Sequence, residues 1–116
     1  MTSPIVHVDI PVNNLENGAD FYRDVFGWEL NSDMPGYPMF KAEGGPGGGF
    51  VQKGDGDQVR IYLMSNDINA SLADIEAHGG KTVMPRTEIE GGHGAFAVFT
   101  DPSGNTLALY SAPAQQ

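Results

Sequence analysis

The clearest structural signal in the chain is the stretch Ile5-Val6-His7-Val8-Asp9-Ile10-Pro11-Val12, in which every even-numbered residue is apolar. A period of two predicts a β-strand with one buried face. We expect the apolar side chains to pack on the core, and we expect His7 and Asp9 to lie together on the other face. Apolar residues at helical spacing follow within residues 15–26, and Gly27 is suited to end a helix there.

Three further strands are expected in the first half of the chain, at residues 28–31, 39–42 and 50–52. The glycine-rich residues 44–49 are interpreted as a flexible loop that leads into the last of these strands. No lysine and hydroxyl residue follow the glycines in the pattern of a phosphate-binding loop, so we assign them no such role.

The same order of elements begins again near residue 59. Residues 59–65 alternate like the first stretch, and residues 68–75 carry apolar side chains at helical spacing. Strands are then expected at residues 82–89, 95–100 and 106–110. A shift of 53 positions lays one half on the other and aligns His7 with Arg60. We interpret this as an internal duplication of a βαβββ unit, although any two strand–helix pairs show some similarity of this kind.

The length and composition indicate one small domain, residues 1–116, with modules at about residues 4–54 and 57–112. No apolar run is long enough for a membrane span, the N-terminus does not resemble a secretory signal, and cysteine is absent. These features favour a cytoplasmic protein. The formal net charge of −9 disfavours nucleic acid and anionic membranes as partners. We therefore expect a small molecule, or a second copy of the chain, as the partner.

Four segments together resemble the vicinal oxygen chelate superfamily, which includes glyoxalase I, bleomycin resistance proteins and extradiol dioxygenases. They are residues 6–12, 21–28, 75–81 and 96–105, and in this order they span nearly the whole chain. The branch related to lactoylglutathione lyase is the most similar. The resemblance implies an α+β fold in which two tandem βαβββ modules form a curved mixed sheet around a pocket, commonly in a homodimer.

Metal-using members of this family hold a divalent ion with histidine and carboxylate side chains from four strand positions. His7 matches the first position, and the second falls within residues 49–52, which offer no carboxylate. Arg60 aligns with the third position and Ala108 with the fourth, and neither side chain is able to ligate a metal. We therefore expect no metal and no other cofactor at the usual site. The alternative is an atypical site in which Asp9 and His93 join His7.

By the resemblance, the face away from the helices lines the ligand pocket. The candidate ligand-binding residues are His7, Asp9, Arg60, Tyr62, His93, Ala108 and Tyr110, with His7 as the candidate general base. A purely structural alternative is that Asp9 pairs with Arg60 across adjacent strands and that His7 is a hydrogen-bonded interior residue.

The functional prediction is a metal-independent, small-molecule-binding protein of the glyoxalase/bleomycin resistance type. The alternative is an enzyme of the superfamily, a lyase or isomerase related to lactoylglutathione lyase, with His7 as a base or a partial metal ligand.

Overall fold

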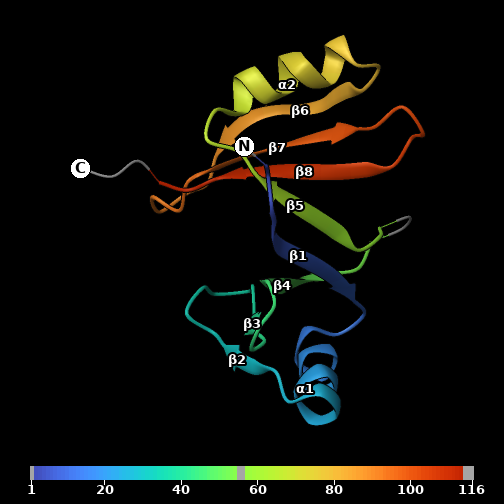
Figure 1. Ribbon diagram of the computed structural model, residues 1–116. Coiled ribbons are helices and arrows are strands. Elements are labelled where there is room, and N and C mark those ends of the chain that lie inside the picture. The colour runs from blue at the N-terminus through green and yellow to red at the C-terminus, as the bar shows by residue number, and fades with distance from the viewer. Residues whose placement is uncertain (1, 55–56, 114–116) are drawn as a thin grey trace. The chain divides into compact units, whose positions relative to one another are not determined.

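The computed structural model describes residues 2–54 and 57–113, and these residues form two compact units. The first unit is Val6–Ile61, and the second contains residues 62–113 together with residues 2–5. Each unit has one helix and a small β-sheet (Figure 1). In the described part of the chain, no helix has both the length and the apolar character that crossing a bilayer requires.

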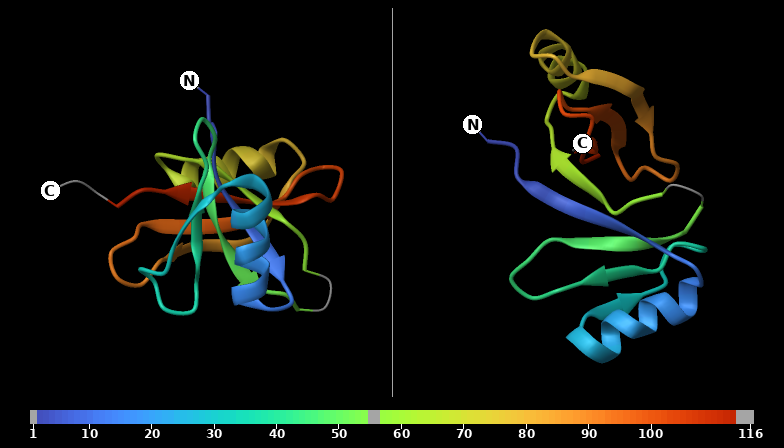
Figure 2. Two further views of the ribbon diagram at one scale, coloured as in Figure 1. Left: turned by 90° about the horizontal axis from the view of Figure 1, so that it is seen from below. Right: turned by 90° about the vertical axis from the view of Figure 1, so that its right-hand side faces the viewer.

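The first unit is a four-stranded sheet with a helix on one face (Figure 2). Its elements are β1 (Ile5–Val12), α1 (Leu15–Phe26), β2 (Glu29–Asn31), β3 (Met39–Lys41) and β4 (Gly47–Gln52). The strand order is β2-β3-β4-β1, in which β1 and β4 are parallel and the other pairs are antiparallel. The side chain of Asn14 accepts a hydrogen bond from Asn17 N at 2.9 Å and caps α1, which ends at Gly27 with a φ of 74°.

The second unit repeats this topology. Its elements are β5 (Arg60–Met64, whose first two residues fall in the first unit), α2 (Ile68–Ala77), β6 (Lys81–Glu88), β7 (Ala95–Thr100) and β8 (Thr106–Ser111). Its strand order is β6-β7-β8-β5. As in the first unit, the strands that come first and last in the sequence, β5 and β8, are parallel, and the other pairs are antiparallel. The predicted α+β fold with two βαβββ modules is therefore confirmed.

The helix-facing side of each sheet carries the apolar core of its unit. In the first unit the core is Ala19, Phe40 and Phe50, against which Val8, Ile10 and Val12 of β1 pack. Phe50 is fully buried against the tilted rings of Tyr22 and Phe40, and Trp28 stacks on Phe40 with ring centroids 4.2 Å apart. In the second unit Ile68 and Leu72 of α2 pack on small and apolar residues of β7 and β8.

The glycine-rich segment is not the flexible loop that the sequence suggests, because its second half, Gly47–Gln52, is strand β4. Gly48 lies so close to its neighbours that a β-carbon there would stand 1.8 Å from the carbonyl oxygen of Val8 in β1. Glycine is required in this strand for close approach rather than for freedom of the backbone. The interpretation of residues 44–49 as a loop is therefore wrong for residues 47–49.

Asp101 organises the tight turn between β7 and β8. One of its carboxylate oxygens accepts backbone hydrogen bonds from Ser103 and Asn105, and the other accepts one from the side-chain amide of Asn105, all at 2.9 Å. The bond from the Asn105 side chain, followed by the one from its backbone, holds the pKa of Asp101 below its ordinary value.

Replacing this carboxylate should therefore cost stability in a pH-dependent way. A group with a lowered folded-state pKa stabilises the fold above its unfolded pKa and loses that contribution as the pH falls through the folded value. We expect Asp101→Ala to lower the melting temperature at neutral pH and to differ less from the unmodified chain at about pH 3. Melting curves recorded at both pH values check this, and a difference that is the same at both would contradict it.

Candidate functional site

The face of the first sheet that points away from α1 carries the polar side chains of β1. Strand alternation places Val8, Ile10 and Val12 in the core, so His7 and Asp9 share the opposite face, as the sequence predicts. Their side chains are 24% and 14% exposed, respectively, so each is largely but not fully removed from solvent.

A third residue, Tyr37, joins His7 and Asp9 from the segment between β2 and β3. The Tyr37 hydroxyl lies 2.5 Å from Asp9 Oδ1 and 2.6 Å from His7 Nε2, and Nε2 lies 2.9 Å from the same carboxylate oxygen. Three polar atoms thus form a small triangle, which we call the polar triad (His7, Asp9 and Tyr37). The imidazole and phenol rings are nearly stacked, with centroids 6.3 Å apart.

The number of protons fixes the direction of the hydrogen bonds in the polar triad. A phenol has a single proton, and Tyr37 donates it to the Asp9 carboxylate. The 2.6 Å contact between His7 Nε2 and the phenol oxygen is then an N–H donated to Tyr37. The result is a chain of hydrogen bonds running from His7 through Tyr37 to Asp9, in which each bond strengthens the next.

Tyr37 is held in place by its own loop and by a glycine beneath its ring. Its backbone N–H donates to Met34 O at 3.2 Å, and the carbonyl of the next residue, Pro38, accepts from Phe50 N at 2.9 Å. A β-carbon at Gly49 would lie 2.2 Å from the ring carbon that bears the Tyr37 hydroxyl. The phenol therefore occupies the space in which a side chain at position 49 would begin.

Sequence reasoning missed Tyr37. The residue lies outside every strand and helix, so no periodicity assigns it to a face of the sheet. The only available signal was indirect, because three consecutive glycines in a segment of β-strand character indicate a close approach of other atoms.

The strand register identifies which residue of β4 occupies the second metal-ligand position, which the sequence comparison placed within residues 49–52. Asp9 pairs with Gly49 in the first unit, and Tyr62, which the 53-residue shift equates with Asp9, pairs with Ala108 in the second. Gly49 and Ala108 are therefore equivalent, and neither has a donor atom on its side chain. Arg60 at the start of β5 is a permanent cation. The residues present do not fit the usual metal centre, and residues 2–54 and 57–113 contain no group of three or more histidine, cysteine or acidic side chains that could hold a metal ion.

The remaining predicted residues belong to the second unit. Tyr62 and Ala108 are neighbours across β5 and β8, and Ala108 is fully buried. Tyr110 donates its hydroxyl hydrogen bond to the backbone carbonyl of His93 at 2.8 Å. His93 itself is exposed in the loop between β6 and β7, and its ring lies over Gly91. The backbone of His93, rather than its imidazole, is thus the part that contacts another predicted residue.

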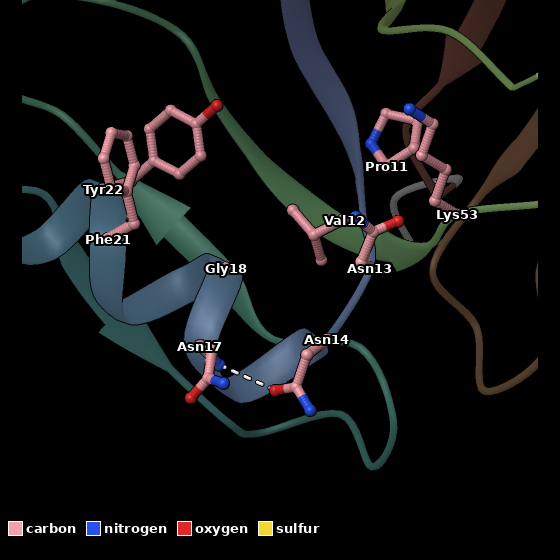
Figure 3. A pocket seen from close by; sticks show the side chains of 9 residues that line it. All are labelled: Pro11, Val12, Asn13, Asn14, Asn17, Gly18, Phe21, Tyr22 and Lys53. Atoms are coloured by element: carbon pink, nitrogen blue, oxygen red, sulfur yellow. Dashed lines mark hydrogen bonds between the residues drawn. The ribbon is translucent and has the colours of Figure 1, made fainter.

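A separate groove of about 480 Å³ lies at the end of β1 beside the first turn of α1 (Figure 3). It is lined by Pro11, Val12, Asn13, Asn14, Asn17, Gly18, Phe21, Tyr22 and Lys53. None of the predicted site residues lines it. It contains amides and one lysine but no group suited to proton transfer near neutral pH.

Two family models match the chain. Residues 4–42 match a model described as Bleomycin resistance protein-like N-terminal. Residues 60–109 match a model described as Glyoxalase/Bleomycin resistance protein/Dioxygenase superfamily. The two matches cover the first strands and helix of the first module and nearly all of the second.

Similar proteins include a glyoxylase-like domain-containing protein of Didymella fabae, which is 29% identical over 91% of this chain and 91% of its own length. The anthracycline biosynthesis protein DauV of Streptomyces sp. (strain C5) is 30% identical over 88% of this chain, but this chain spans only 44% of DauV. The crystal structure of a superfamily member from Vibrio splendidus 12B01 has a TM-score of 0.69 and 14% identity, covering 95% of this chain and 99% of that one. This last similarity establishes the shared fold.

Proposed function

We propose that this chain, which belongs to the glyoxalase/bleomycin resistance protein/dioxygenase superfamily, is a small-molecule-binding protein whose polar triad holds the ligand without a metal ion. The observation that carries the proposal is the convergence of His7, Asp9 and Tyr37 on the sheet face away from α1. Hydrogen bonds among partly buried polar groups are stronger than the same bonds in water, so such a cluster is well suited to orient a ligand.

The triad favours a ligand that bears oxygen atoms on a rigid, largely apolar frame. Imidazole, phenol and carboxylate together both donate and accept hydrogen bonds, which matches carbonyl and hydroxyl groups. The similarity to an anthracycline biosynthesis protein supports an aromatic hydroxy-ketone, although this chain covers less than half of that relative. We extend the proposal to Arg60, Tyr62, His93, Ala108 and Tyr110 as further ligand contacts, and to a cytoplasmic homodimer as the working form.

An enzymatic role, as a lyase or isomerase of the superfamily, is the second candidate. It is favoured by the short contacts between the ionisable groups of the triad, because a chain of this kind can pass a proton to or from a ligand. Methylglyoxal with glutathione is the discriminating substrate: formation of S-lactoylglutathione would favour the enzyme, and its absence in an assay with a working glyoxalase control favours binding alone.

Removal of the imidazole tests the binding proposal, with 2-hydroxyanthraquinone as the probe. His7→Ala deletes the group that donates to Tyr37, so the triad loses its order. We expect the dissociation constant of the probe to rise at least about tenfold, the usual consequence of losing one charged or strongly polarised hydrogen bond. Absorbance or fluorescence titration of the probe measures it.

His78→Ala is the matched control, because His78 is exposed at the end of α2 and its Nδ1 makes a local hydrogen bond to Asp74 O at 2.8 Å. The control should bind the probe as the unmodified chain does, and treatment with a chelator should leave binding unchanged. Equal affinity of both histidine variants, or loss of binding on chelation, would overturn the proposal.

A further inference from the structure

The groove beside the first turn of α1 has an apolar floor and an aromatic wall. At the floor α1 lies directly against β1, because a β-carbon at Gly18 would stand 2.6 to 2.9 Å from three side-chain atoms of Val12. Phe21 and Tyr22 lie one turn further along the helix, and their rings meet edge to face with centroids 5.1 Å apart. Phe21 remains 54% exposed, so one side of this wall is open to a ligand.

A cation belongs to the same groove. Figure 3 shows the two aromatic rings on the helix side of Val12 and Lys53 on the other side. The backbone N–H of Lys53 donates to Val12 O at 2.8 Å, which holds this residue beside the end of β1. Its ammonium group carries the only charge among the described lining residues, and it forms no ion pair within the described part of the chain. The cation is therefore available to an anion from outside the chain.

We infer that this groove is a second binding site, separate from the polar triad, for an organic anion with an aromatic ring at one end and a carboxylate at the other. Its volume of about 480 Å³ lies within the range of about 300–1,000 Å³ that is usual for small-molecule sites. A ring placed on Phe21 removes apolar surface from water and gains a ring–ring contact. The single ammonium of Lys53 complements a single carboxylate. The site does not depend on the proposed function, because no residue of the polar triad lines it.

The probe that tests this site is 4-phenylbutyrate, titrated into isotope-labelled protein and followed by the backbone amide signals in nuclear magnetic resonance spectra. The signals of Asn17, Gly18 and Lys53 should shift, and those of His7 and Asp9 should not. The uncharged 4-phenylbutanamide has the same ring and chain, so it should bind about threefold more weakly, as expected for one solvent-exposed charge pair. High salt should reduce this difference. Butyrate, which lacks the ring, should bind more weakly than 4-phenylbutyrate.

Lys53→Gln removes the cation and keeps a side chain of similar length. We expect it to weaken the binding of 4-phenylbutyrate about threefold and to leave the binding of 4-phenylbutanamide unchanged. Lys41→Gln is the matched control, because Lys41 is exposed on β3 and lies outside the lining of the groove. It should bind both compounds as the unmodified chain does.

Phe21→Ala removes the open side of the aromatic wall. It should weaken the binding of both compounds about fivefold, because each loses the apolar surface that the ring covers. Val25→Ala is the matched control, because Val25 is 56% exposed one turn further along α1 and does not line the groove. Melting curves should show that all four variants are folded.

Several outcomes would overturn the assignment of this site. Unchanged affinity for 4-phenylbutyrate in Lys53→Gln or in Phe21→Ala would do so, as would shifts at His7 and Asp9 in place of the groove. Groove signals that respond to protein concentration but not to the probe would mark a contact between copies of the chain instead. None of these results bears on the binding of 2-hydroxyanthraquinone at the polar triad, so the proposed function stands or falls separately.

Discussion

Gly48→Ala is expected to destabilise the protein by about 3 kcal/mol, at the upper end of the cost of inserting a methyl group into a packed interior. The new β-carbon would stand 1.8 Å from the carbonyl oxygen of Val8 and 2.6 Å from the ring of Phe40. The carbonyl belongs to the backbone of β1, which pairs with β4 at this residue, so it cannot move without disturbing the parallel pair. In a chain of this size the loss should lower the melting temperature by roughly 10 °C.

Gly45→Ala is the control for this prediction. A methyl group added at Gly45 meets no atom within 4 Å, and the Gly45 backbone is not in the left-handed region. Thermal and denaturant unfolding of the two variants give the comparison. Equal stability of Gly45→Ala and Gly48→Ala would show that β1 and β4 do not approach each other as closely as described.

Ala108→Glu is expected to cost about 4 kcal/mol at neutral pH, because it buries a carboxylate and overpacks a filled site. Ala108 is fully buried in β8, between Tyr62 of β5 and Val98 of β7 in the strand register. This is also the position at which a metal-using relative is expected to carry a ligand. The loss of stability in this variant therefore measures how poorly position 108 accepts the carboxylate that a metal site would need.

The penalty should depend on pH. Burial raises the folded-state pKa of an introduced carboxyl above its value in the unfolded chain. The destabilisation is therefore greatest above the folded-state pKa, and it is partly relieved as the pH falls below that value and the carboxyl becomes neutral. Ala73→Glu, at an exposed position of α2, should change stability little at any pH. Denaturant titrations at several pH values check both variants, and a mild, pH-independent effect of Ala108→Glu would contradict the prediction.

The candidate site was predictable from the sequence only in part. Alternation alone places His7 and Asp9 side by side, because residues two apart in a strand share a face. Tyr37 was not predictable, because its position depends on how an irregular segment folds back over β4, and hydrogen bonds across about 28 residues leave no local pattern. The groove beside α1 was likewise unforeseen, since it arises from the packing of three separate segments.

The glycine-rich segment shows where local reasoning gave a wrong result. Glycine is usually read as a source of backbone freedom, which suggested a loop. In the folded chain, Gly48 and Gly49 are buried in a strand, where their missing side chains make room for a backbone carbonyl and for the Tyr37 ring. A sequence does not distinguish these two uses of glycine, because the second depends on atoms far away along the chain.

The order of elements and the buried faces of β1 and β5 were determined by the sequence itself, since these follow from the spacing of apolar residues and from local caps, which neighbouring residues control. Membership of the superfamily was also apparent from the motifs. Which polar atoms meet was decided only by the tertiary structure. Tyr37 reaches Asp9 and His7 from an irregular segment whose ring occupies the space left by the missing side chain of Gly49. The strength of a hydrogen bond depends on separations of a few tenths of an ångström, which no one-dimensional pattern encodes.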